Sequence, residues 1–310
     1  MLNPAKIILQ TCLNVKHGEK VLIIADKNTE NLAHKILHEA VKITHSSLKI
    51  IPVGKHNGDE PPAEIAKEML HYDVIIAPTT TSLTHTKAIR NAKNNARVAT
   101  LPGITERVMN GSLLADYNRI EKFTKKILKK LNGSVNVNVV TTKGSNFSFS
   151  VDGRKWFPDT GILSKKGTCT NLPAGEVFVS PLEGSFNGKI VLDLFKHEGE
   201  TYAANGSVIE VRKGKVVSCS DKNSRVNSYF KTIKNADNIA EFGIGTNYKA
   251  KIIGNILQDE KVLGTCHVAF GNNSNIDGKV YSKLHLDTVL QKPTIVVDDS
   301  VLMKYGKFLL

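Results

Sequence analysis

The chain has 310 residues, of which 41% are apolar, and a formal charge of +13, which suits a globular protein of about two domains. No apolar run approaches the roughly 20 residues that span a bilayer, and the N-terminus lacks the apolar stretch and cleavage site of a secretory signal. These features predict a cytoplasmic protein without a membrane partner. The four cysteines form no CxxC pair, which argues against a disulfide framework or a cysteine zinc site.

The positive charge raises the question of a nucleic-acid partner. The lysines are dispersed, however, and aromatic residues make up only 6% of the chain, too few to provide stacking platforms among the basic residues. Only KFTKKILKK, residues 122–130, is densely basic, and its apolar residues recur as on one face of a helix, so its lysines are interpreted as a solvated helix face. We therefore expect no nucleic-acid partner.

Compact apolar runs alternate with helical patterns along the first part of the chain. The apolar runs are GEKVLIIAD (18–26), LKIIPVG (48–54), DVIIAPT (73–79) and RVATLPG (97–103), and the helical patterns are 28–43, 61–72 and 85–96. Strands that are apolar throughout and alternate with helices predict a parallel sheet covered on both faces. Residues 1–134 are therefore predicted to form a doubly wound, Rossmann-like α/β domain. No GxGxxG follows the first strand, so dinucleotide binding has no support.

From residue 135 onward the pattern changes to short alternating runs separated by glycine and asparagine, such as VNVNVVT, FSFSV and TIVVDD. This pattern predicts a mainly β domain over residues 135–310. SVIEVRKGKVVSC is predicted to be a hairpin that turns at RKGK, and residues 224–240 are predicted to be a helix. The predicted fold class is α/β plus α+β.

Possible metal ligands gather in four glycine-flanked stretches of this second domain. The stretches are NLPAGEVFVSP, EFGIGTN, DEKVLGTCHVAFG and KLHLD, which contain Glu176, Glu241, Glu260, His267, His285 and Asp287. Residues two apart in a strand point to the same face, so the last two side chains can reach one cation. Mixed nitrogen and oxygen donors suit zinc, cobalt, manganese or ferrous iron, and are too rich in histidine for calcium.

Each of these residues also has a simpler interpretation. A single histidine in a β domain is more often a hydrogen-bonded core residue than a ligand, which applies equally to His85 and His197. Glu176 could be a charge at a strand end, Glu241 the acid at the end of a helix, and Glu260 part of an exposed turn. Their joint occurrence in one domain favours a metal site.

These four motifs, in this order after TSLTHTKA and ARVATLPGIT, resemble the aminopeptidase T family of metallopeptidases over nearly the whole chain. The resemblance implies a pair of divalent metal ions, such as zinc, cobalt or manganese, a peptide substrate and a homodimer. It implies metal-binding roles for Glu176, Glu241, Glu260, His267, His285 and Asp287. Glu176, or else Glu241, would carry the proton to the leaving amine while the metals activate water.

The sequence departs from the family pattern at two positions. Gly175 stands where the family usually has a second acidic residue, and GNNSNIDG replaces the stretch that carries the catalytic tyrosine, which leaves Tyr281 as the nearest candidate. Two other hypotheses follow. The superfamily includes 2,5-dihydroxypyridine dioxygenase, which uses one Fe(II), and His267, His285 and Asp287 have the composition of a facial triad. A non-catalytic binding protein that keeps the fold is the third.

Overall fold

The structure is a computed structural model that describes residues 3–193, 195–197 and 200–310. The chain divides into two compact units: unit 1 comprises residues 1–121 and 160–174, and unit 2 comprises residues 122–159 and 175–310. Helix α6, Tyr117–Leu131, contains the change from one unit to the other and ends three residues before the predicted domain boundary. No helix in the described part of the chain is long and apolar enough to cross a membrane.

Unit 1 contains a five-stranded parallel sheet, here sheet A, in the order β2-β1-β3-β4-β8. Its strands are β1 (Val21–Asp26), β2 (Ser46–Ile51), β3 (Val74–Ala77), β4 (Arg97–Thr100) and β8 (Cys169–Asn171). Its helical segments are α1 (Pro4–Lys6), η1 (Ile7–Cys12), α2 (Glu30–Ala40), α3 (Ala63–Glu68), η2 (Met69–His71), α4 (Lys87–Ala92), α5 (Glu106–Met109) and η3 (Ser112–Leu114).

The alternation of strands and helices read from the sequence is therefore confirmed. All six residues of β1 are buried, as a central strand of a parallel sheet requires. Leu22 and Ile24 of this strand share an apolar core with Ile65 of α3 and Ile89 of α4, whereas α2 packs on β1 outside that cluster. Strand β8 is an addition that the pattern did not predict, because three residues are too few to show a period.

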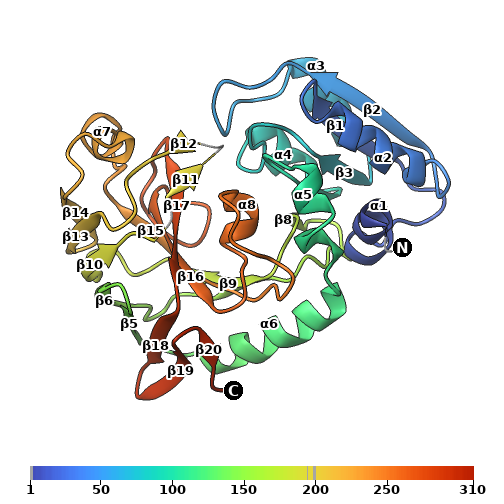
Figure 1. The fold of residues 1–310 in the computed structure, drawn as a ribbon. Helices are drawn as coiled ribbons and strands as arrows, with labels where there is room; N and C mark the ends of the chain where they lie inside the picture. Colours follow the sequence, from blue (N-terminus) through green and yellow to red (C-terminus); the bar gives the residue numbers. More distant parts are fainter. Residues whose placement is uncertain (1–2, 194, 198–199) are drawn as a thin grey trace. The chain divides into compact units, whose positions relative to one another are not determined.

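Unit 2 is built mainly from two antiparallel sheets (Figure 1). Sheet B has the order β14-β13-β10-β6-β5-β18-β19-β20, and its strands are β5 (Asn136–Thr141), β6 (Asn146–Ser150), β10 (Asn187–Val191), β13 (Val208–Arg212), β14 (Lys215–Cys219), β18 (Pro293–Val297), β19 (Ser300–Lys304) and β20 (Lys307–Phe308). Sheet C has the order β17-β16-β15-β9-β7, and its strands are β7 (Phe157–Asp159), β9 (Glu176–Val179), β15 (Ile239–Gly245), β16 (Thr265–Gly271) and β17 (His285–Gln291). The remaining elements are β11 (Lys196–His197), β12 (Glu200–Thr201), α7 (Arg225–Thr232) and α8 (Ile256–Asp259).

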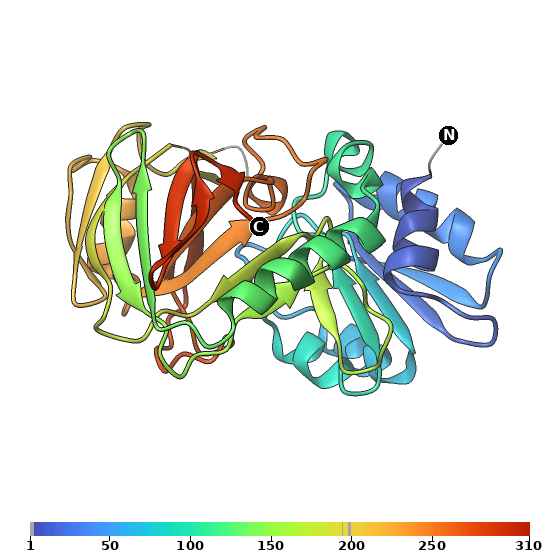
Figure 2. The same ribbon diagram turned by 90° about the horizontal axis from the view of Figure 1, so that it is seen from below.

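The core of unit 2 lies between the facing sides of sheets B and C. Figure 2 shows β5 and β6, in green, beside the red β18 in sheet B. Phe149 of β6 lies 5.0 Å from Phe242 of β15, ring centre to ring centre, and both belong to one buried cluster with Val268 of β16. Because strand residues alternate between faces, this cluster also determines which side chains of sheet C point away from the core.

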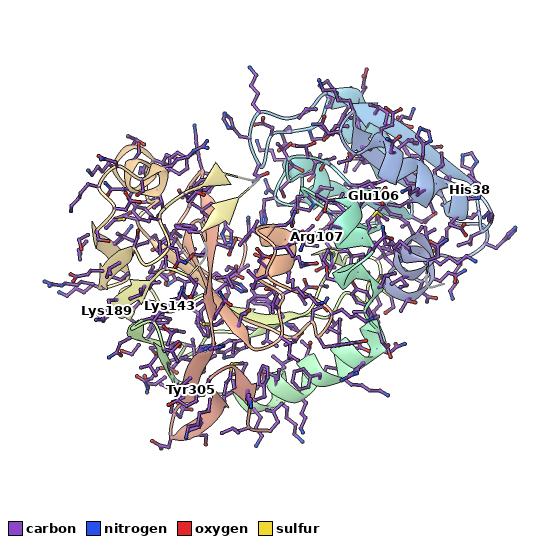
Figure 3. All side chains as sticks on the ribbon, viewed as in Figure 1. His38, Glu106, Arg107, Lys143, Lys189 and Tyr305 are labelled. Atoms are coloured by element: carbon purple, nitrogen blue, oxygen red, sulfur yellow. The ribbon has the colours of Figure 1, made fainter. Side chains whose placement is uncertain are left out.

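The mainly β pattern predicted from the sequence is confirmed in unit 2 except in one segment, whereas the domain bounds stay a prediction. The β13–β14 hairpin forms as expected, with left-handed Lys213 and Gly214 at its turn. The helix predicted over residues 224–240 ends at Thr232, and the chain enters β15 at Ile239 after a left-handed Asn235. Glu241 therefore lies within a strand and is not the terminal acid of a helix. The lysines of α6 are exposed as predicted, and exposed lysines also occur in the turn between β5 and β6 and on β10, where Lys143 and Lys189 are labelled in Figure 3.

Candidate metal centre

Most of the predicted ligands lie on the face of sheet C that points away from the core. Phe242 and Ile244 of β15, and Cys266 and Val268 of β16, belong to the core cluster. The residues that alternate with core residues along these strands face the opposite way. They include Glu241 on β15, His267 on β16, and His285 and Asp287 on β17. Glu176 opens β9 on the same face, opposite Gly245. Four neighbouring strands thus bring together residues that are up to 111 positions apart.

Small residues stand opposite each of these side chains in the strand register. Gly243 pairs with His267, Gly245 with Glu176, Ala269 with Asp287 and Gly271 with His285. A Cβ atom at Gly243 would overlap the imidazole of His267. The glycines in EFGIGTN therefore provide the space in which the functional side chains lie over the sheet.

Two imidazoles lie on either side of one carboxylate. Nε2 of His267 is 3.4 Å from Oε1 of Glu241 and 3.4 Å from Oε2 of Glu176. Nε2 of His285 is 3.5 Å from Oε2 of Glu241 and 3.8 Å from Oδ1 of Asp287. The two oxygens of Glu241 thus face different histidines, and the donor atoms of Glu176, Glu241 and His267 lie within 4.8 Å of one another.

A buried lysine completes the cluster on the side of Glu176. The ammonium of Lys261, whose side chain is 3% exposed, lies 2.5 Å from Oε1 of Glu176, 2.8 Å from Glu260 and 3.9 Å from Asp159. Glu260 is thus buried beside the cluster and does not form the exposed turn considered above, because its carboxylate pairs with this ammonium. Five carboxylates and one ammonium give a net charge of −4 when both imidazoles are neutral.

This concentration of charge shifts the ionisation of the cluster. Burial alone would lower the pKa of His267, but the carboxylates of Glu241 and Glu176 outweigh burial and raise it to about 9. The pKa of His285 is raised in the same way by Asp287 and Glu241 against the effect of burial. Burial raises the pKa of Glu260 to about 8, although the charge of Lys261 acts in the opposite direction. The cluster therefore favours bound positive charge, whether protons or metal cations.

The donor set fits divalent metal ions. Oε2 of Glu176 is buried and has no hydrogen-bond partner among the described residues. Two ligands about 2.1 Å from one ion at a tetrahedral angle are about 3.4 Å apart, which is the separation of His267 from both glutamates. The excess of carboxylates over ammonium groups in this buried site matches cations better than hydrogen bonds alone.

The orientation of His285 is determined by a backbone carbonyl. Its Nδ1 lies 2.8 Å from the carbonyl oxygen of Asn272, and since a carbonyl oxygen only accepts, Nδ1 carries the proton. Nε2 is then the ring nitrogen available to a metal, and it is the atom that faces Glu241 and Asp287.

Other candidates from the sequence lie elsewhere. Tyr281 is 68% exposed, and within the described part of the chain its hydroxyl makes no hydrogen bond to the cluster. His85 is exposed in the loop before α4. His197 belongs to β11, and its side chain lies outside what the structure describes.

Three contributors could not be identified from the sequence: Lys261, Asp159 and Asn272. Lys261 follows Glu260 directly in DEKVLG, and this adjacency was the one available signal, since a lysine in a polar stretch is usually exposed. Asp159 reaches the cluster only because β7 pairs with β9, where it stands opposite Glu176. Asn272 contributes through its backbone, which no side-chain pattern reveals.

Comparisons with known proteins find a matching family model and solved structures of similar fold. Residues 63–287 match the family model described as thermophilic metalloprotease (M29). The structure is similar to that of 2,5-dihydroxypyridine dioxygenase from Pseudomonas putida KT2440, with a TM-score of 0.85 and 15% identity over 99% of this chain and 96% of that one. It is also similar to AmpT from Thermus thermophilus, with a TM-score of 0.73 and 16% identity over 99% of this chain and 98% of that one. A search of curated proteins finds no match.

Proposed function

Because the chain belongs to the thermophilic metalloprotease family M29, we propose that it is an aminopeptidase that removes N-terminal residues from peptides with a pair of divalent metal ions. The family implies the use of divalent metals and peptides as the substrate class. The exact reaction, the number of ions and their identity belong to the proposal.

The arrangement of Glu241 is the observation that supports a metal pair most strongly. Its two carboxylate oxygens face two different imidazoles at 3.4 and 3.5 Å, so Glu241 could help to hold an ion beside each histidine. One ion would be held by Glu176, Glu241 and His267, and the other by Glu241, His285 and Asp287. Two divalent ions would also balance the net charge of −4, whereas one would leave half of it.

Bound divalent ions would supply Lewis-acid chemistry, namely activation of water and polarisation of the scissile carbonyl. The protein's own residues set the conditions for this chemistry. Lys261 holds Oε1 of Glu176 at 2.5 Å, so Oε2 is the oxygen of Glu176 that faces His267. The sheet beneath the site excludes water from one side, since Phe242 and Val268 are fully buried. The proton-carrying roles of Glu176 and Glu241, and any role of Tyr281, stay predictions.

Metal analysis combined with an activity assay tests the proposal. Protein purified without added metal should contain zinc, cobalt or manganese, approaching two equivalents after loading, and should release the chromophore from a leucine anilide. His285→Ala should lose activity and one equivalent of metal. A fully loaded protein that hydrolyses no N-terminal amide from a panel of aminoacyl anilides and dipeptides would refute the aminopeptidase assignment.

One observation supports a second candidate. The high structural similarity to a 2,5-dihydroxypyridine dioxygenase accompanies a cluster in which His267, His285 and Asp287 alone have the composition of an Fe(II) facial triad. One equivalent of iron and oxygen uptake with a dihydroxypyridine would favour this reaction. Absence of bound metal from protein purified without added metal would instead favour a non-catalytic binding protein.

The expected cytoplasmic location, homodimer and lack of a nucleic-acid partner also stay predictions.

A further inference from the structure

The loop between β16 and β17, residues 272–284, is folded around one fully buried side chain, Asn273. The amide nitrogen of Asn273 donates to the hydroxyl of Ser180 at 3.0 Å and to Oε1 of Glu183 at 3.2 Å, and its amide oxygen accepts from the N–H of Val280 at 2.7 Å. Its backbone carbonyl accepts from the N–H of Gly278 at 3.0 Å. One asparagine therefore joins the two halves of the loop.

A charged pair holds the same loop from the neighbouring segment. Oε1 of Glu183, which lies between β9 and β10, also accepts from the N–H of Lys279 at 2.8 Å, and Oε2 pairs with the guanidinium of Arg154. Arg154 in turn donates to the carbonyl of Asp277. Burial would raise the pKa of Glu183, but these hydrogen bonds and the charge of Arg154 outweigh burial and keep it below its usual value. The loop thus rests on an ionised carboxylate.

Apolar contacts contribute little to the shape of this loop. The side chains of Ser274, Asn275, Asp277, Lys279 and Tyr281 are exposed, Ile276 and Val280 are half-buried, and Leu284 at the end of the loop packs against the core, so apolar burial opposes local opening mainly at that end. Weakening the polar contacts should therefore loosen the loop while the core between sheets B and C remains folded.

The loop ends on the metal centre. The backbone carbonyl of Asn272, directly before Asn273, accepts from Nδ1 of His285 at 2.8 Å, and the N–H of Asn272 donates to the carbonyl of Leu284 at 2.7 Å. The direction of this carbonyl sets the plane of the imidazole and keeps the proton on Nδ1. Nε2 is thereby left to face Glu241.

We propose that Glu183 and Asn273 are positioning residues of the metal centre: they hold the loop whose Asn272 carbonyl orients His285 for metal binding. Neither residue touches the cluster, and neither belongs to the motifs that resemble the peptidase family. The inference rests on the proposed function only in requiring that His285 binds a metal. Outer partners of metal-binding histidines typically change metal affinity by about 10-fold to 100-fold when they are mutated.

Three variants test this inference. Glu183→Ala removes the acceptor and the charge, Glu183→Gln keeps one acceptor oxygen, and Lys279→Ala is the matched control because Lys279 contributes its backbone N–H and an exposed side chain. We expect zinc affinity, measured by competition with a chromophoric chelator, to fall about 10-fold to 100-fold in Glu183→Ala and by a smaller but measurable factor, up to about tenfold, in Glu183→Gln. Lys279→Ala should bind zinc like the wild type.

A second readout reports on His285 directly. In the wild type, with and without zinc, the Nδ1 proton of His285 should give a slowly exchanging imidazole signal in ¹H–¹⁵N spectra, assigned by its loss in His285→Ala. This signal should broaden or disappear in Glu183→Ala and persist in Lys279→Ala. A merely structural role of Glu183 would lower the melting temperature without moving the signal or the zinc affinity.

The inference is wrong if Glu183→Ala keeps both the zinc affinity and the Nδ1 signal of the wild type. If Glu183→Ala does not fold, Glu183→Gln decides alone, and unchanged zinc affinity in that variant overturns the inference. Both measurements are made without peptide. A protein that lacks aminopeptidase activity but shows these shifts would therefore refute the proposed function and leave this inference standing.

Discussion

Two buried carboxylates at strand ends, one in each unit, differ in how their oxygens are satisfied. Asp26 ends β1 and is 1% exposed; it accepts from the N–H of Asn28 and from both the N–H and the hydroxyl of Thr80. Glu176 opens β9 and is 5% exposed; one oxygen pairs with Lys261 and the other has no hydrogen-bond partner among the described residues.

The difference separates a structural carboxylate from a functional one. Neutral donors surround Asp26 and compensate the loss of hydration within the protein itself. Around Glu176 lie the ammonium of Lys261, the imidazole of His267 and further carboxylates, and the carboxylates outnumber the ammonium, which leaves negative charge for bound cations or protons to balance. Burial of an acid is therefore a weaker sign of function than the chemistry of what surrounds it.

The strongest test of this contrast is the pair of variants Glu241→Gln and Asp26→Asn. Glutamine keeps the shape of Glu241 but replaces one of its two oxygens and removes its charge. Because metal stabilisation of a transition state is worth several kcal/mol, we expect the kcat/KM for a leucine anilide to fall at least about 1,000-fold. Elemental analysis after dialysis should show less bound metal.

Asp26→Asn is the control, because its site holds the carboxylate with hydrogen bonds alone. It should keep the metal content and the kcat/KM of the wild type at a temperature where the variant is folded. Wild-type metal content in Glu241→Gln would contradict the assignment of Glu241 as a ligand.

Lys261→Met should produce the largest loss of stability. The change keeps the length of the side chain but leaves Glu176, Glu260 and Asp159 without their shared ammonium. Removing one partner of a buried ion pair typically costs about 3–5 kcal/mol, and we expect a loss of this size in the free energy of unfolding of metal-free protein, measured with urea. Added zinc should recover part of the loss, because it supplies positive charge to the same carboxylates.

Lys215→Met is the matched control for this substitution. Lys215 and its partner Asp237 are 40% and 34% exposed, and such pairs contribute at most about 1 kcal/mol. Equal losses in the two variants would mean that the buried ammonium has no special role.

Asp26→Ala should have a smaller effect that metal does not change. The variant leaves the N–H of Asn28 and the N–H and hydroxyl of Thr80 without their acceptor, which typically costs about 1–3 kcal/mol. Urea unfolding with a chelator and with zinc should give the same loss relative to the wild type. A loss that zinc reverses would place Asp26 in the metal-dependent part of the protein and remove the contrast with Glu176.

The sequence predicted the fold well where a period was long enough to read. The buried runs of β1, β3 and β4 indicated the parallel sheet, and alternation in β5, β6 and β13 indicated the β unit. The three residues of β8 carry no period. Residues 224–240 contain a helix and the start of a strand, and their apolar residues suited a single helix equally well.

The candidate site was predicted as far as its residue types allow. Glu176, Glu241 and His267 stand out because imidazoles and carboxylates beside glycine are unusual in buried strands. Lys261 and Asp159 could not be predicted, because their positions depend on strand pairing and on charge partners more than 80 residues away. Periodicity reports which face a residue occupies, and it does not report which distant residue shares that face.

Glu19 is compensated in a way intermediate between Asp26 and Glu176, because its carboxylate pairs with one charged donor. The pH dependence of stability tests how much that charge contributes. Glu19 pairs with the buried guanidinium of Arg97 at 2.6 Å. Burial would raise the pKa of Glu19, but the hydrogen bonds from Arg97 and the N–H of Lys16 outweigh burial and lower it. A carboxyl group with a lowered pKa in the folded state stabilises the protein above its unfolded pKa, and this stabilisation is lost as pH falls through the folded value.

Glu19→Gln should therefore be less stable than the wild type by about 1 kcal/mol at pH 7, the upper end for a partly exposed pair. The two proteins should converge as the pH falls below about 4, near the ordinary pKa of glutamate, since the wild type then loses the same ion pair. Urea unfolding between pH 7 and pH 3.5 measures both values. Glu106→Gln, whose partner Lys35 is more than half exposed, should show no such convergence. A constant difference between Glu19→Gln and the wild type across this range would mean that Arg97 stabilises the folded chain through packing and neutral hydrogen bonds, and not through the charge of Glu19.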